Sequence, residues 1–193
     1  MEPIKFVYDD GGRSKYFSGK NVGDCVCRAI TIASGKDYKE IYDLLAKTMG
    51  ESPRNGVFTN KPCFKRMMRD LGFEWHSLAG IGVKQAFHFY DGELPRDGRM
   101  VCSVTKHNVA VVNNELHDIW DSRYNSFGQM RRIYGYWLYK GDQVLAKKVD
   151  DVKVVVKKIS KHQVGDIHPK HSDWVWTEYK PGKFDWRVVK NRV

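Results

Sequence analysis

The sequence is poor in cysteine and has no long hydrophobic run. Its 193 residues include four cysteines, too few for a disulfide framework in a chain of this size. No apolar stretch approaches the roughly 20 residues of a transmembrane helix, and the N-terminus lacks the basic, apolar and small-residue pattern of a signal peptide. We therefore expect reduced thiols, no membrane contact and a cytoplasmic location, in the host cytoplasm if the protein is viral.

A metal site also has little support in the sequence. Cys25 and Cys27 form a Cys-x-Cys pair that has no matching second pair, whereas a structural zinc site usually takes two such pairs. Cys63 or a histidine would have to complete the ligands. We expect no metal and no cofactor.

The composition is that of a soluble globular protein with an excess of positive charge. Hydrophobic residues make up 41% and charged residues 29% of the chain, and the net charge is +10. Such a surface attracts polyanions, so nucleic acid, an anionic cell-wall polymer and an acidic protein are all candidate partners. The same charge also keeps a protein soluble, so it does not identify which of these partners binds.

The first half of the chain is predicted to be helical. Apolar residues at helical spacing predict three helices. The first ends at Gly35 as a left-handed C-cap. The second runs from an Asp37 N-cap to Gly50, and the third from an Asn60 N-cap to Gly72.

Strand patterns dominate the second half. They cover residues 100–105, 108–112, 115–120 and 132–139, with earlier strands at 4–8 and 73–78. Segregated helices and strands predict an α+β fold, in which the N-terminal helices pack on an antiparallel sheet. We expect this domain to occupy residues 1–140.

Residues 141–193 form a basic tail, with 12 Lys and Arg against 7 Asp and Glu. Strand patterns at 144–149, 152–159, 174–179 and 184–189 predict a β-rich extension, either a separate module or strands added to the main sheet. Aromatic residues lie among its basic ones. They would suit stacking on nucleic-acid bases or on sugars, or packing against the domain.

Cys25 lies where a glycine-marked loop turns into the first predicted helix. Asp24 fits the N-cap, where its carboxylate would accept from the N–H of residue 26 or 27. The unpaired N–H groups and the macrodipole of a helix N-terminus favour a thiolate, so Cys25 is a candidate nucleophile. Cys27 lies about 200° around the helix and is expected to pack in the core.

His107 is the candidate base for Cys25. It opens the strand at 107–112, where a polar ring can face a cleft while the strand beyond is buried. A cysteine nucleophile needs such a base, and the base needs an orienting group.

The turn Asn113-Asn114 indicates which group orients His107. Both residues tolerate positive φ and suit a two-residue type I′ turn. The resulting register makes Asp118 a diagonal neighbour of His107, about 7–8 Å away between α-carbons. Asp121 and His117 would point the other way, and a one-residue change in the turn would bring them in instead.

These stretches resemble the papain-like cysteine peptidase superfamily. Gly23-Asp24-Cys25 is similar to the Asp-Cys of its NlpC/P60 branch, and the strand from His107 is similar to that of NlpC/P60 and C39-type peptidases. With Tyr134-Gly135-Tyr136-Trp137, the pattern also resembles small papain-like proteins encoded by bacteriophages. The resemblance covers roughly residues 14–140.

The resemblance implies a Cys25 nucleophile, a His107 base and an orienting Asp118, with the Cys25 N–H in the oxyanion hole. The glutamine that papain and C39 enzymes carry upstream of the cysteine is absent here, and Asn21 or Tyr16 are candidates for its place. The Ser-Gly that often follows Asp-Cys in NlpC/P60 proteins is also replaced, here by Val-Cys.

The sequence therefore predicts a thiol protease or related hydrolase. It would cleave an amide or isopeptide bond of a peptide or protein substrate through an acyl-enzyme, as a peptidase, deamidase or amidase. The alternative is a catalytically inactive phage protein that binds nucleic acid or another polyanion through its basic tail.

Overall fold

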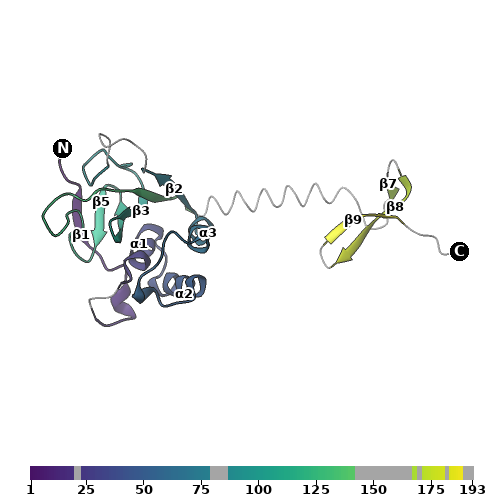
Figure 1. Cartoon of the computed structure of the whole chain (residues 1–193), viewed down its shortest axis with the longest axis horizontal. Coiled ribbons are helices and arrows are strands. Elements are labelled where there is room, and N and C mark those ends of the chain that lie inside the picture. The colour runs from purple at the N-terminus through teal and green to yellow at the C-terminus, as the bar shows by residue number, and fades with distance from the viewer. Residues whose placement is uncertain (20–22, 79–86, 142–166, 169–170, 181–182, 189–193) are drawn as a thin grey trace. The chain divides into compact units, whose positions relative to one another are not determined.

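The computed structural model describes residues 1–19, 23–78, 87–141, 167–168, 171–180 and 183–188 (Figure 1). The chain divides into two compact units, Met1–Val144 and Leu145–Val193. The strands predicted over residues 144–149 and 152–159 lie outside the described residues. No helix in the described part is long and apolar enough to cross a membrane.

The first unit contains three α-helices among its described residues. They are α1 (Cys25–Ser34), α2 (Tyr38–Met49) and α3 (Pro62–Asp70). The C-caps Gly35 and Gly50 have φ of 72° and 73°, the left-handed conformation that glycine adopts without steric cost. These two predicted helix ends are confirmed, whereas the C-cap of α3 is Leu71, one residue before the predicted Gly72.

One predicted N-cap is wrong, and another has the predicted position without the predicted hydrogen bond. The N-cap of α3 is Lys61 rather than Asn60, and Pro62 begins the helix with its fixed φ and no side-chain cap. Asp24 does occupy the N-cap of α1, but its carboxylate makes no capping hydrogen bond. The carboxylate is fully buried and binds two arginines instead.

The described strands of the first unit form one six-stranded sheet in the order β1-β5-β4-β3-β6-β2. Their bounds are β1 (Lys5–Tyr8), β2 (Phe73–Ser77), β3 (Arg99–Val104), β4 (His107–Val112), β5 (Glu115–Asp118) and β6 (Gly135–Tyr139). The sheet is mixed rather than antiparallel, because β1 pairs with β5 in parallel. The long chain between these two strands permits that pairing.

The hairpin that carries His107 has the predicted turn. Asn113 and Asn114 have φ of 49° and 64°, as a type I′ turn requires. The register pairs Val112 with Glu115 and Ala110 with His117, which confirms the prediction along the ladder between β4 and β5.

The three helices lie on one side of the sheet (Figure 1). Ile30, Leu45 and Met68 pack there against Val101 and Ala110 of the sheet. A second hydrophobic cluster fills the opposite face. The first unit is therefore α+β, and the packing of α1 on β4 brings the N-terminus of that helix to the start of the strand.

The described strands of the second unit are β7 (Ile167–His168), β8 (His171–Lys180) and β9 (Lys183–Val188). They form an antiparallel sheet in the order β7-β8-β9.

The cap of α2 gives a test of the local structure. The Asp37 carboxylate accepts from the N–H groups of Lys39 at 2.8 Å and Glu40 at 3.4 Å. Asp37→Ala should lower the free energy of unfolding by about 1 kcal/mol in urea denaturation. Asp43→Ala, which removes only an exposed pair with Lys39, should cost less than about 0.5 kcal/mol. Equal losses for both variants would contradict the capping role.

Candidate active site

The structure brings Cys25, His107 and Asp118 together. Cys25 is the first residue of α1 and is half-buried, His107 is the first residue of β4, and Asp118 is the last residue of β5. Three separate elements thus contribute one side chain each, because α1 packs on β4 and β5 pairs with β4.

The His107 imidazole connects the other two side chains. Its Nε2 lies 2.6 Å from Oδ2 of Asp118, and the ring is close enough to the Cys25 thiol that each group shifts the pKa of the other. Since Nε2 of His107 bonds to Asp118, Nδ1 of His107 is the nitrogen that remains for Cys25. The arrangement has the order nucleophile, base and orienting carboxylate.

Electrostatics favour a charged pair of thiolate and imidazolium. Burial alone raises the pKa of Cys25, but the hydrogen bond and charge of His107 outweigh burial and lower that pKa below the ordinary cysteine value. Burial alone lowers the pKa of His107, but its hydrogen bonds to Asp118 and Cys25 raise it to about 9. Both shifts favour the ionised pair over the neutral one.

Asp118 is itself held in place by two further groups. Its Oδ1 accepts from the N–H of Ile119 at 2.8 Å, and it lies 3.7 Å from Nη2 of Arg28. Both Asp118 and Arg28 are buried. A carboxylate fixed in this way holds the imidazole in one orientation.

Arg28 connects Asp118 to the buried Asp24. The Asp24 carboxylate forms a close ion pair with Arg28, lies 2.7 Å from Nε of Arg13 and accepts from the Tyr38 hydroxyl at 2.6 Å. These partners explain why Asp24 does not cap α1. The first-turn N–H groups, next to Cys25, have no side-chain cap.

Arg13 also fixes the loop that precedes Cys25. Its Nη1 donates to the carbonyl oxygens of Phe17 at 3.2 Å and Gly19 at 2.6 Å. The buried ion pairs therefore extend from this loop, through α1, to the strand that carries Asp118.

Tyr16, one of the two candidates for the place of the missing glutamine, has its hydroxyl bound to another side chain. The Tyr16 hydroxyl donates to Asp37 at 2.8 Å and is 44% exposed as a residue. Asn21 lies outside the described residues.

The alternative orienting groups lie elsewhere. Asp121 binds the guanidinium of Arg123 at 2.7 and 2.9 Å, and His117 lies 3.1 Å from Asp9. The predicted preference for Asp118 over both agrees with these positions.

The remaining cysteines differ from Cys25. Cys27 is fully buried, and burial raises its pKa to about 12. Cys102 is buried and its pKa is raised for the same reason, whereas Cys63 is exposed. Among the described residues, no group of three or more His, Cys, Asp or Glu side chains could hold a metal ion.

Sequence reasoning missed Arg13, Arg28 and Trp120 as parts of the site. The role of Arg28 could have been predicted. It lies four residues after Asp24 on an otherwise apolar helix face, and a charge buried there requires a partner of opposite charge. Trp120 packs on His107, with ring centroids 5.2 Å apart, and its place opposite His107 followed from the hairpin register. Nothing in the local sequence pointed to Arg13.

No protein-family model, curated protein or solved structure matches this chain.

The buried carboxylate of Asp24 gives a second prediction. Asp24→Asn removes the paired carboxylate of the buried Arg13 and leaves the buried Arg28 with only the more distant Asp118, at 3.7 Å. It should therefore lower the free energy of unfolding by about 3–5 kcal/mol. Asp43→Asn, at an exposed ion pair, should cost less than about 1 kcal/mol. Urea denaturation measures both, and a loss below 1 kcal/mol for Asp24→Asn would contradict the structural role given to this carboxylate.

Proposed function

We propose that this protein is a cysteine-dependent hydrolase of amide or isopeptide bonds. The observation that carries the proposal is that one imidazole, His107, bonds to the Asp118 carboxylate and lowers the pKa of the Cys25 thiol at the start of α1. A papain-like fold belongs to the same proposal. It is supported by the position of the cysteine at a helix N-terminus and of the histidine at the start of a strand packed on that helix.

The reaction begins with attack of the Cys25 thiolate on the carbonyl carbon. A C–S bond forms and the carbonyl electron pair moves to oxygen. The N–H groups at the start of α1, which no side chain caps, can donate to that oxyanion. When the intermediate collapses, the C–N bond breaks and the His107 imidazolium gives its proton to the leaving nitrogen.

Hydrolysis of the acyl-enzyme completes the cycle. Neutral His107 takes a proton from water as the water oxygen attacks the thioester carbon. The C–S bond then breaks, the acyl group leaves as a carboxylic acid, and the thiolate–imidazolium pair is restored. The Asp118 carboxylate, 2.6 Å from Nε2 of His107, orients and stabilises the imidazolium.

The pH dependence of alkylation tests the thiol directly. Iodoacetamide reacts with thiolate, so Cys25 should be modified rapidly at pH values where an ordinary cysteine is protonated. His107→Ala removes the largest of the contributions that lower the pKa of Cys25, so burial counts for more. The alkylation midpoint of Cys25 should therefore move to higher pH than in the native protein. Peptide mass spectrometry reads each cysteine separately.

Cys63 is the control for this experiment, because it is exposed and far in sequence from His107. Its alkylation profile should be the same in both proteins. If Cys25 reacts no faster than Cys63 at pH 6 to 7, or ignores the loss of His107, the proposed nucleophile is wrong.

A second candidate function is polyanion binding without catalysis. The net charge of +10 and the 12 basic residues in the tail favour it. Binding of this kind weakens steeply with added salt, and it requires no reactive thiol. A slow Cys25 together with salt-sensitive binding of nucleic acid would support this candidate over the hydrolase.

A further inference from the structure

Two cavities lie close to the candidate base His107. One, of about 310 Å³, reaches Ser103 of β3. The other, of about 430 Å³, is lined by His107 itself. The Ser103 hydroxyl donates to the Asn108 side chain at 2.9 Å, and Asn108 directly follows His107 in β4. Both cavities therefore lie within two residues of His107.

The first cavity has an aromatic wall. Trp75 and Trp137 meet there with ring centroids 5.2 Å apart, and Trp75 is 42% exposed. A β-carbon on Gly135 would lie 2.4 Å from the Trp75 ring, so only glycine allows the indole this position. The two rings offer an apolar surface to a large side chain of a bound molecule.

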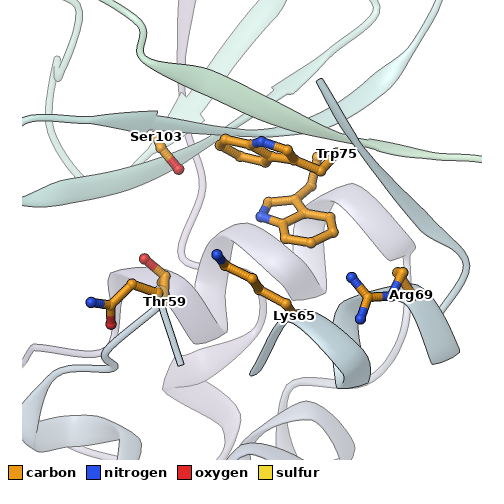
Figure 2. Close-up of a pocket in the computed structure, with 7 residues that line it drawn as sticks. Thr59, Lys65, Arg69, Trp75 and Ser103 are labelled. Carbon is orange, nitrogen blue, oxygen red and sulfur yellow. The ribbon is translucent and has the colours of Figure 1, made fainter. Parts of the chain in front are cut away.

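The same cavity has two cations on its helical side. Lys65 and Arg69 are one turn apart on α3 and line the cavity. Figure 2 shows the Lys65 amino group pointing from the helix toward the sheet, where Ser103 points back toward it. No carboxylate of the described residues pairs with Lys65 or Arg69.

The second cavity is also cationic. Lys106, Arg131 and Arg132 line it, and the Arg131 guanidinium lies 5.2 Å from the Trp120 ring. Arg131 is held by the carbonyl oxygens of Tyr124 and Thr105 at 3.0 and 3.2 Å. None of the described residues that line either cavity is acidic.

We propose that the two cavities bind an acidic polypeptide, with an apolar or aromatic side chain against Trp75 and carboxylates beside the cations. This proposal rests on the proposed function for its choice of substrate, because a thiolate attacks acyl carbons. One cavity is lined by the candidate base His107, and the other reaches Ser103, whose hydroxyl bonds to the neighbouring Asn108. Single-stranded nucleic acid would also suit cations and aromatic rings, so the experiment must distinguish the two ligands.

The test measures binding to the full chain carrying Cys25→Ser, which needs no turnover. The probe is a fluorescent peptide with two glutamates on each side of a phenylalanine–glycine pair, followed by anisotropy. Peptides with glutamine or lysine in place of glutamate are the comparisons, and oligothymidylate is the nucleic-acid competitor. The glutamate peptide should bind about tenfold more tightly than the glutamine peptide, and the lysine peptide should bind weakest.

Two single substitutions in α3 test whether the first cavity is the binding site. Arg69→Glu reverses a charge in the cavity and should weaken binding of the glutamate peptide about fivefold or more. Arg66→Glu reverses a charge on the same helix that lines a different cavity, and binding should change less than about twofold. Since both variants change the net charge equally, attraction to the chain as a whole, including the basic tail, cancels from the comparison.

Three results would overturn the proposal. Equal affinity for the glutamate and glutamine peptides is the first, and equal losses in Arg69→Glu and Arg66→Glu is the second. The third is tighter binding of oligothymidylate that Arg69→Glu abolishes, which would assign the cavity to nucleic acid. Because a serine replaces Cys25, these results are independent of the alkylation experiment, which alone decides whether the thiol is activated.

Discussion

The burial of the Asp24 carboxylate between Arg13 and Arg28 is the interaction on which the rest of the site depends. A charge in the interior requires partners of opposite sign, and breaking such a pair is far more costly than losing a surface ion pair. Asp24 therefore fixes the loop that leads into α1 and, through Arg28, reaches Asp118. It also leaves the first turn of the helix uncapped beside Cys25.

The buried groups alternate in sign along a continuous chain of contacts. A positive arginine, a negative aspartate, a second arginine and a second aspartate lead to His107 and Cys25. An imidazolium and a thiolate continue that alternation, so each charged group lies next to a group of opposite charge. This arrangement accounts for the raised pKa of His107 and the lowered pKa of Cys25 despite the burial of both.

Local sequence rules predicted the structural features that interactions between neighbouring residues determine. Asn113 and Asn114 determine a two-residue turn, so the hairpin register and the choice of Asp118 followed from the sequence. The cap at Asp24 failed because a capping hydrogen bond contributes only about 1 kcal/mol, less than pairing two buried arginines. Those partners come from tertiary structure, and Arg13 in particular lies in a turn with no periodic pattern. The parallel pairing of β1 was unpredictable for the same reason.

The ionisation of Cys25 is the central claim, and thiolate absorbance in the ultraviolet measures it most directly. The difference between the native protein and Cys25→Ser, followed through a pH titration, isolates this one sulfur. We predict a thiolate signal already present at neutral pH, which is lost on acidification below the range of an ordinary cysteine. A difference signal that develops only above about pH 8.5, where free cysteine ionises, would contradict the account.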